Sequence, residues 1–401
     1  MNISNEQIRG YRLHAHHLDQ KLPISSLTAA AGACGIQNSP PGTWETSLFH
    51  RIRGCTFPLL QKALYEEKSL VQAWSFRGAP VIFPTAESDI FLNALTAETG
   101  EQPWIYTKGI SAALEYLQMP FEDLLERTKK AALYLDHHVI KSKETLDQTL
   151  AGIIQKELSP KEQLLWRAPS MYGNPDRQTV GEAAVSFLLR PCSFSSLVVF
   201  GERHGNSPTF TSFINWTGKP PKKHPDGQRE LIRKFLHCYG PSSKDALMRW
   251  LGCSPRQASR LWNTVSEEME PVKTGDKIRY MLSADREALL QSAQPADHLI
   301  LLGPHDPYLD IKDRDILLSN KALQKQIWKT VGNPGAVLKS GQIIGSWKSK
   351  IQKEKIAFTI TLFEPLGSMD QNTLKNLAEE YAAFRQLHPS NILIQPSELT
   401  S

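Results

Sequence analysis

The stretch "GPSSKDALMRWLGCSPRQASRLWNTVSEEMEPVKTGDKIRYML", residues 240–282, decides the fold, because it sets helices, turns and a hairpin in a recognisable order. Ser242 is placed to cap a short helix that Gly252 ends. Ser254 then caps a further helix, and a hairpin is predicted at Gly275. Together with a preceding helix predicted over 227–239, this is the order of a winged helix-turn-helix.

The helix after Ser254 has one apolar stripe and one polar face. Pro255 stands at its first position, and Gln257 is expected to complete a capping box. The residues at helical spacing on the stripe are Ala258, Leu261, Trp262 and Val265. The predicted exposed face carries Arg256, Gln257, Ser259, Arg260 and Asn263. Arg, Gln and Asn can reach base edges or phosphates, so this helix is expected to contact DNA. The alternative is a small helical subdomain with a solvated polar face.

The charge of the chain is concentrated in the same region. The net charge is +5, and residues 220–260 carry nine Lys or Arg against three Asp or Glu. Lys222 and Lys223 stand in the predicted linker "TGKPPKKHPDG". A confined basic patch is expected for a protein with a polyanion as its partner, although a solvated helix face has the same composition.

The order of helices and hairpin is repeated, more weakly, twice before this segment. In the first copy "LVQAWSFRGAPVIFP" forms a hairpin that turns at Arg77 and Gly78, and Ser4 with Gln7 forms a capping box for the opening helix. In the second copy "SLVVFGERHGNSPTFTSFINW" forms a hairpin with Arg203 and His204 at its turn. A tandem array is therefore predicted.

The composition changes after residue 283 toward strand-like runs broken by Ser340-Gly341 and by the charged residues around Lys353. The fold class expected is α+β, with three tandem winged helix-turn-helix units and a C-terminal β-rich domain. The predicted segments are 1–118 for the first unit with its hairpin, 119–217 for the second, 218–283 for the third, and 284–401 for an antiparallel β domain with a closing helix.

Several function classes are excluded or disfavoured by composition. No window reaches the roughly 18 to 20 apolar residues of a membrane helix, and the start lacks the pattern of a signal peptide, so a cytoplasmic, nucleoid-associated protein is expected. The five cysteines form no CxxC pair and indicate neither a disulfide framework nor a zinc site. His14 and His17 share a helix face, as zinc ligands can, but supporting ligands do not follow, so no metal is predicted. No phosphate-binding glycine motif indicates a nucleotide cofactor, and no other cofactor is expected.

Several stretches resemble the winged-helix DNA glycosylases of the AlkZ/YcaQ type. "FLHCYGPSSKDALMRWLGCSPRQASRLW" is similar to the family's third winged helix, and "VQAWSFRGAPVIFP" to its first hairpin. "LLGPHDPYLDIKDRDILL" and "KTVGNPGAVLKSGQIIGSWK" look like its C-terminal domain, with the match carried by Asp306-Pro307-Tyr308, Arg314 and the Gly341 to Trp347 motif. The pieces occur in the family's order. Asp306 itself is predicted to start a structural turn rather than to act in catalysis.

The resemblance implies a site at "CGIQNSPPGTW", residues 34–44, at the end of the predicted second helix. Family members carry Gln-x-Asp or Gln-x-Gln there, similar to Gln37, Asn38 and Ser39. A polar pair would position a water and favour the positive charge that develops on the sugar. This sequence departs from the pattern, because Ser39 is shorter and uncharged. Glu45 and Asn38 are candidate replacements, and Gln37 could alternatively serve only to bond nearby carbonyls.

The resemblance therefore predicts a monofunctional glycosylase that excises alkylated or crosslinked bases from double-stranded DNA. The catalytic candidates are Gln37, Asn38 and Ser39, and the expected DNA contacts are Arg77, Arg203, His204, Lys222, Lys223, Arg256, Gln257, Arg260 and Asn263. The alternative is a non-catalytic winged-helix DNA-binding protein with a regulatory or protective role; a protein-interaction scaffold is a third class. The natural lesion and the oligomeric state do not follow from the sequence.

Overall fold

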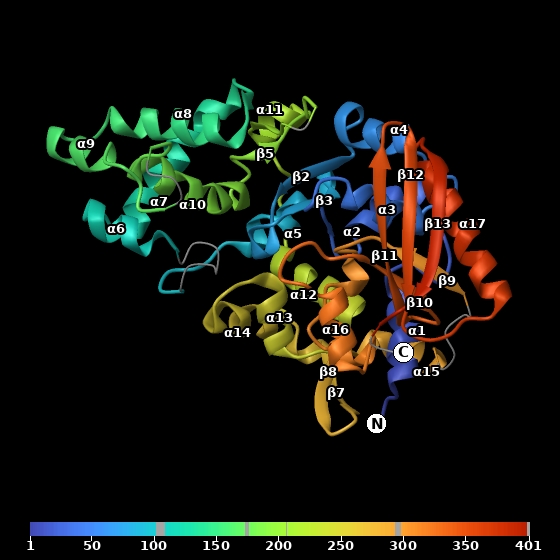
Figure 1. The fold of residues 1–401 in the computed structure, drawn as a ribbon. Coiled ribbons are helices and arrows are strands. Elements are labelled where there is room, and N and C mark those ends of the chain that lie inside the picture. The colour runs from blue at the N-terminus through green and yellow to red at the C-terminus, as the bar shows by residue number, and fades with distance from the viewer. Residues whose placement is uncertain (102–108, 173–175, 206, 293–297, 399–401) are drawn as a thin grey trace. The chain divides into compact units, whose positions relative to one another are not determined.

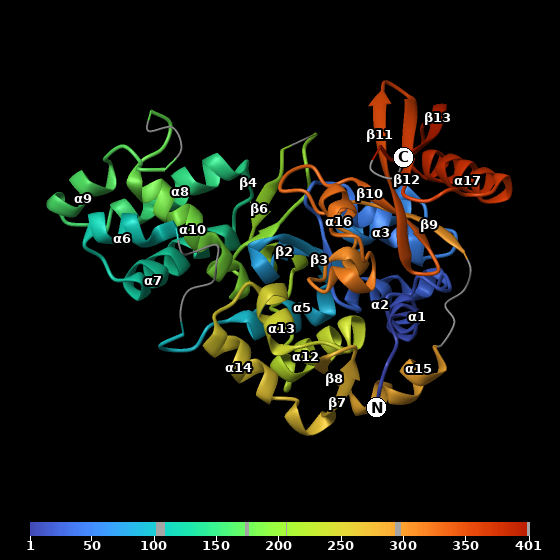
Figure 2. The ribbon, with the colours of Figure 1, turned by 60° about the horizontal axis from the view of Figure 1, so that its bottom comes forward.

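The computed structural model describes residues 1–101, 109–172, 176–205, 207–292 and 298–398 (Figure 1, Figure 2). Its mixture of helices and strands confirms the α+β class. Backbone packing divides the chain into two compact units. The first comprises Met1–Lys62, Ile232–Leu247 and Val265–Ser401, and the second comprises Ala63–Leu231 and Met248–Thr264. The four segments predicted from the sequence were bounded by repeated motifs and not by packing, and they remain a prediction. Among the described helices, none is both long and apolar enough to span a bilayer.

The first unit opens with short helices and one short strand. They are α1 (Asn5–Ala15), α2 (Leu27–Gly32), β1 (Ile36–Gln37), α3 (Thr43–Arg51) and α4 (Phe57–Gln61). The predicted capping box of α1 is present, because Ser4 Oγ accepts from the Gln7 amide and Gln7 Oε1 accepts from the Ser4 amide. The helix ends at Ala15, since His17 takes a left-handed conformation with φ 54°.

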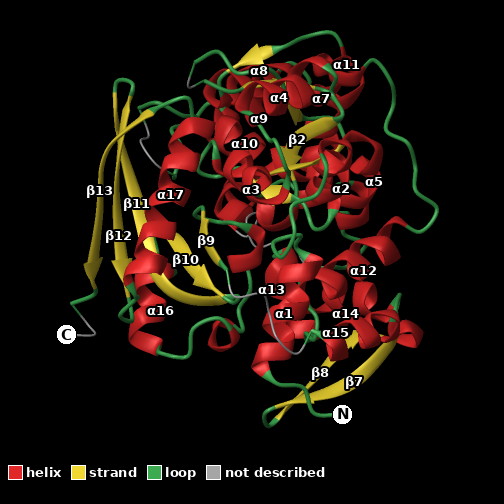
Figure 3. Cartoon of the chain, turned by 90° about the vertical axis from the view of Figure 1, so that its right-hand side faces the viewer, coloured by secondary structure: helices red, strands yellow, loops and turns green. Residues whose placement is uncertain are grey.

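A five-stranded sheet forms the C-terminal part of the first unit, in the order β13-β12-β11-β10-β9. Its strands are β9 (Leu299–Leu302), β10 (Gly335–Lys339), β11 (Gln342–Gln352), β12 (Lys355–Leu362) and β13 (His388–Pro396). Strands β9 to β12 pair antiparallel in chain order, with turns at Ser340-Gly341 and at Lys353, as the sequence predicted. Helix α17 (Ser368–Phe384) packs Leu374, Ala378 and Ala382 into the core on one face (Figure 3).

The prediction of a fully antiparallel domain closed by a helix is wrong at the end of the chain. After α17 the chain returns as β13, which pairs parallel to β12 with Ile394 opposite Ile360. The strand was missed because its residues are mostly exposed and His388, Pro389 and Asn391 are poor strand formers. Pairing with β12 decides its conformation.

The three helices predicted in residues 227–263 form, but Ser243 rather than Ser242 caps the second of them: Ser243 Oγ accepts from the Ala246 amide at 3.2 Å. The helices are α12 (Gly227–Tyr239), α13 (Lys244–Leu251) and α14 (Pro255–Asn263). The division between the two units passes through α12 and α13. In the first unit, β7 (Met269–Thr274) and β8 (Lys277–Leu282) form the predicted hairpin, with Gly275 at φ 57° in its turn. Two further helices of that unit are α15 (Arg286–Gln291) and α16 (Lys321–Ile327).

Two hairpins meet in one sheet of the second unit. Strand β2 (Leu70–Trp74) pairs with β3 (Pro80–Pro84) around the predicted turn, where Arg77 and Gly78 have φ of 56° and 64°. Strands β5 (Val199–Phe200) and β6 (Thr209–Thr211) form the second predicted hairpin. Within this unit the strand order is β3-β2-β5-β6-β4, where β4 is Ile140–Lys141.

Five helices of the second unit pack around one apolar core (Figure 2). They are α6 (Ser111–Leu117), α7 (Phe121–Ala132), α8 (Lys143–Gln155), α9 (Pro160–Trp166) and α10 (Val180–Phe194). The unit also contains α5 (Ser88–Phe91) and α11 (Phe213–Thr217). The Trp166 indole donates to the Ala151 carbonyl at 3.1 Å. The ring lies so close to Gly181 that a Cβ there would be 2.2 Å from it, so any side chain at this position would displace the indole.

Candidate active site

The candidate catalytic residues lie on a turn in the first unit, between α2 and α3. The prediction of Gln37 at a helix end is wrong: α2 ends at Gly32, and Gln37 closes the two-residue strand β1. Gly35 has φ 70°, which ends the helical path before the strand. Gln37 and Ser39 are half-buried, and Asn38 is buried.

Hydrogen bonds from α3 hold the backbone of this turn. Thr43 Oγ1 donates to the carbonyls of Gln37 at 2.8 Å and of Pro40 at 3.0 Å. The Gly42 amide donates to Asn38 Oδ1 at 2.8 Å. Gly42 has φ 100°, a conformation that residues with a Cβ rarely adopt. The Asn38 side chain therefore holds the turn in place. Gln37 and Ser39, on either side of it, are the more accessible candidates for catalysis.

The side chain of Gln37 also contacts its own turn. Its Nε2 donates to the Ser39 carbonyl at 3.2 Å. This bond orients the amide plane, because only the nitrogen end can donate. The chemistry expected of Gln37 uses the other end, where an amide oxygen can accept from a water.

Two charged side chains flank Gly42. A Cβ built on that glycine would lie 3.8 Å from Glu45 Oε2 and 3.7 Å from Arg385 Nη1. Glu45 stands in the first turn of α3 and is 7% exposed, and its Oε1 accepts from Gln61 Nε2 at 3.4 Å. The sequence had suggested Glu45 as a possible neighbour of the site. Arg385 was missed, because nothing local in the sequence links the end of α17 to this turn.

Helix α3 is fixed at its far end as well. Arg51 forms a buried ion pair with Asp306, which also accepts from the Tyr308 amide at 3.0 Å. Asp306 thus starts a structural turn, as predicted. Phe49 stacks on Phe384 with ring centroids 4.6 Å apart. The turn that carries Gln37 is therefore attached to a helix with buried contacts along its length.

All nine predicted DNA contacts belong to the second unit, whereas the catalytic candidates belong to the first. The exposed ones are His204, Lys222, Lys223, Arg256 and Asn263. The half-buried ones are Arg77, Arg203 and Arg260. Arg77 donates to the Trp250 carbonyl at 2.9 Å, and its guanidinium lies 5.1 Å from the Phe76 ring centroid. Trp250 is 4% exposed and stacks on Phe76, so its ring belongs to the core.

The predicted exposed face of α14 is partly covered by the chain itself. Gln257 has no exposed surface, and its Nε2 donates to the Leu95 carbonyl at 2.8 Å, so its predicted exposure is wrong. The Ser254 side chain caps the helix as predicted, but the Gln257 side chain does not complete the box. Tertiary packing directs the Gln257 side chain to Leu95 instead of to the helix cap, because a buried side-chain amide needs a hydrogen-bond partner.

Arg260 and Arg256 also contact the segment after Leu95. Arg260 pairs with Glu101 at 2.8 Å and with Glu98 at 3.3 Å, and Arg256 donates to the Gly100 carbonyl at 3.1 Å. Burial would raise the pKa of Glu101, but the hydrogen bonds and charge of Arg260 lower it overall. Much of the basic character of α14 is therefore used in intramolecular bonds.

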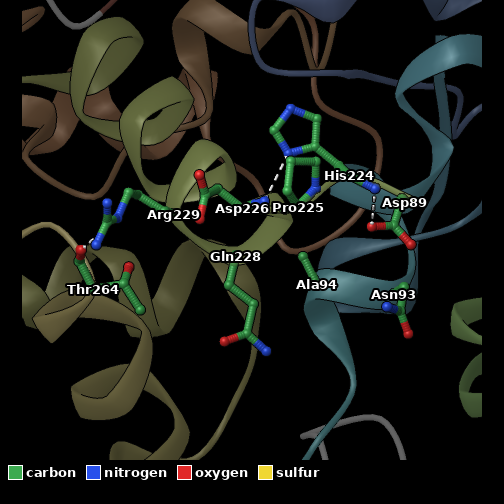
Figure 4. A pocket seen from close by; sticks show the side chains of 10 residues that line it. Asp89, Asn93, Ala94, His224, Pro225, Asp226, Gln228, Arg229 and Thr264 are labelled. Atoms are coloured by element: carbon green, nitrogen blue, oxygen red, sulfur yellow. Dashed lines mark hydrogen bonds between the residues drawn. The ribbon is translucent and has the colours of Figure 1, made fainter. Parts of the chain in front are cut away.

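The predicted linker before α12 is anchored. The His224 amide donates to Asp89 Oδ2 at 2.9 Å, and the Asp226 amide donates to His224 Nδ1 at 3.2 Å (Figure 4). These residues line a cavity of about 390 Å³ that extends to Arg229 and Thr264. The exposed Lys222 and Lys223 therefore precede a fixed segment, a feature that the composition of the linker did not suggest.

The chain is similar to known proteins in both sequence and fold. Residues 30–384 match the family described as DNA glycosylase AlkZ-like, and the chain belongs to that family. Its fold is similar to that of the Streptomyces sahachiroi DNA glycosylase AlkZ, with a TM-score of 0.76, 19% sequence identity, and coverage of 98% of this chain and 100% of that one. No curated protein sequence matches the chain significantly. The resemblance read from the sequence is confirmed, and DNA is the substrate that the family implies.

Proposed function

We propose that this protein is a monofunctional DNA glycosylase that hydrolyses the N-glycosidic bond of alkylated or crosslinked bases in duplex DNA. Membership of the AlkZ-like family over residues 30–384 supports the reaction class. The helix and hairpin groups support three winged-helix units as the DNA-binding framework, with the hairpins at Arg77, His204 and Gly275 as the wings.

Gln37 is the residue to which we assign the attacking water. An N-alkylated purine is cationic and leaves readily, so the protein's task is to place a water and to tolerate positive charge on the sugar. The Gln37 amide oxygen accepts from that water, and the Ser39 hydroxyl assists. Glu45, beside Gly42, supplies the negative charge that Ser39 lacks. Asn38 holds the turn through the Gly42 amide.

One observation carries the proposal: the amide of Gln37 is half-buried on a turn whose carbonyls are held by Thr43. A preorganised acceptor needs no reorganisation during the reaction, which is the condition for electrostatic catalysis. The exposed Lys222 and Lys223, next to the anchored His224, are proposed to contact phosphates.

Release of 7-methylguanine from duplex DNA tests the proposal. The wild-type protein should generate abasic sites, and Gln37→Ala should reduce their formation by about 100-fold or more. Glu45→Gln should reduce it as well, because the carboxylate charge is removed while the shape is kept. Gln20→Ala, a change of the same type at an exposed position of the first unit, should have no effect. Absence of release from both alkylpurine and crosslinked duplexes would disprove the enzymatic activity.

A non-catalytic DNA-binding protein is the second candidate. The Gln37 amide bonds the Ser39 carbonyl, a contact that also suits a purely structural glutamine. Binding to duplex DNA that weakens steeply with salt, without any base release, would establish this second function.

A further inference from the structure

A buried cluster in the first unit brings together three side chains that are potential metal ligands. They are His16, Cys34 and Cys238, whose ligand atoms all lie within 4.8 Å of one another. Their exposures are 1%, 3% and 0%. The Cys34 Sγ to His16 Nδ1 distance is 4.0 Å, and the Tyr239 hydroxyl donates to Cys34 Sγ at 3.7 Å.

We propose that His16, Cys34 and Cys238 form a buried binding site for a thiophilic metal ion such as Zn²⁺. Two thiolates and one imidazole are a ligand set that soft or borderline metals select over Mg²⁺ or Ca²⁺. The Tyr239 oxygen, or a water, would complete four-coordination.

The spacing of the ligand atoms is compatible with this role. With Zn–S near 2.3 Å and Zn–N near 2.0 Å, tetrahedral geometry places the two sulfurs about 3.8 Å apart and a sulfur about 3.6 Å from the nitrogen. Starting from separations of at most 4.8 Å, the ligands would close by about 1.2 Å or less. Side-chain rotation at Cys34 and Cys238 can supply such a shift.

The electrostatic surroundings also favour a cation. His16 caps the C-terminus of α1, Cys34 follows the C-terminus of α2, and Cys238 is in the last turn of α12. Helix C-termini carry partial negative charge. The carbonyls of Ala15 and Ala33 lie 3.8 Å and 3.4 Å from Cys238 Sγ, so the ends of two helices face this sulfur.

One atom of the cluster is unsatisfied as the chain stands. His16 Nε2 is buried and has no hydrogen-bond partner in the described structure, although the ring packs edge-on against Tyr239 and Tyr308. A buried polar atom without a partner is costly. Metal ligation through Nε2 would remove that cost, whereas ligation through Nδ1, the nitrogen 4.0 Å from Cys34 Sγ, would not.

The site would act on the candidate catalytic turn. Cys34 precedes Gln37 by three residues, separated by Gly35 and Ile36. A metal at this point would tie the start of the turn to α1 and α12, in addition to the bonds from Thr43 at its other end. The proposed role is structural and does not rest on the glycosylase activity.

The metal content of tag-free protein tests the site. After incubation with Zn²⁺ and desalting, mass spectrometry should find about one zinc per chain in the wild type and in Cys192→Ser, a buried cysteine of the second unit that serves as the control. The Cys34→Ser, Cys238→Ser double variant should retain about tenfold less. Because that variant can fail to fold, Co²⁺ titration of the wild type is the second measurement, and thiolate-to-cobalt absorption is expected.

Two results would overturn the proposal. One is wild-type protein that holds no zinc after incubation and gives no thiolate absorption with Co²⁺. The other is a Cys34→Ser, Cys238→Ser double variant that folds and retains as much zinc as the wild type, since the metal would then be held elsewhere.

Discussion

Arg51 and Asp306 form a bidentate ion pair in the interior of the first unit, with Nη1–Oδ2 and Nη2–Oδ1 distances of 2.8 Å each. Their side chains are 2% and 0% exposed. Arg51 is the last residue of α3, and Asp306 caps the turn after β9. The pair therefore connects the helix that braces the Gln37 turn to the C-terminal sheet.

Removing one partner of this pair should destabilise the protein strongly. Asp306→Asn leaves the Arg51 guanidinium buried without its counter-charge, and the expected loss is about 3 to 5 kcal/mol in the free energy of unfolding. Urea denaturation measures it. Glu270→Gln, which breaks the exposed pair with Arg286, is the matched control and should cost less than about 1 kcal/mol. Equal losses at the two sites would contradict a dominant role for the buried pair.

His50, the neighbour of Arg51, should make stability depend on pH. Burial lowers its pKa to about 3, with a smaller opposing effect from the charge of Asp306. A histidine whose pKa is lower in the folded state is protonated first in the unfolded chain. Stability should therefore be highest above about pH 6.5 and fall as the pH drops toward 3, by about 1.4 kcal/mol per unit of pKa difference at most.

His50→Phe provides the comparison, because it keeps an aromatic ring packed against Phe49 and removes the titrating group. The variant should lose less stability than the wild type between pH 6.5 and 5, where most carboxylates remain ionised. Denaturant midpoints at several pH values measure this difference. Parallel curves for the two proteins would show that His50 is not the group responsible.

Replacing Lys222 and Lys223 together by Gln should weaken binding to duplex DNA. Both lysines are exposed. For each lysine–phosphate contact that the double variant loses, the slope of log K against log salt should become shallower by about 0.9. Fluorescence anisotropy over a salt series measures it. Arg260→Gln is the control, because Arg260 is already paired with Glu101 and should affect affinity less. A larger effect at Arg260 would restore α14 as the main DNA-binding element.

Ser39→Asp should raise the rate of base release. The family resemblance implies a carboxylate or amide at this position, and an anion would favour the positive charge developing on the sugar. An increase of about tenfold or more in single-turnover release of 7-methylguanine is expected. Ser39→Ala should lower the rate instead. If both variants match the wild type, position 39 lies outside the chemistry.

Local signals account for what the sequence predicted well. Helix α12 has the predicted bounds of Gly227 and Tyr239, and the turns at Arg77-Gly78 and at Gly275 join the predicted strands. Periodicity, caps and turn residues act over a few neighbours, so one sequence is sufficient to read them. The candidate turn at Gln37 was located in the same way, with help from the family resemblance.

Long-range packing decided the rest. The partner of Gln257 is Leu95, and Glu45 and Arg385 both flank Gly42. Strand β13 forms because its backbone pairs with that of β12. In each case a buried or edge group must be satisfied by a residue that only the fold brings near.

The sequence by itself determined the α+β class, the helix and hairpin order, the family and the position of the candidate turn, because these depend on local chemistry and on motif order. Only the tertiary structure decided which charged residues of α14 are already engaged, what surrounds Gln37, and that His16, Cys34 and Cys238 meet. Hydrogen bonds, ion pairs and metal ligation act over a few ångströms in space, and distance along the chain does not predict which groups come within that range.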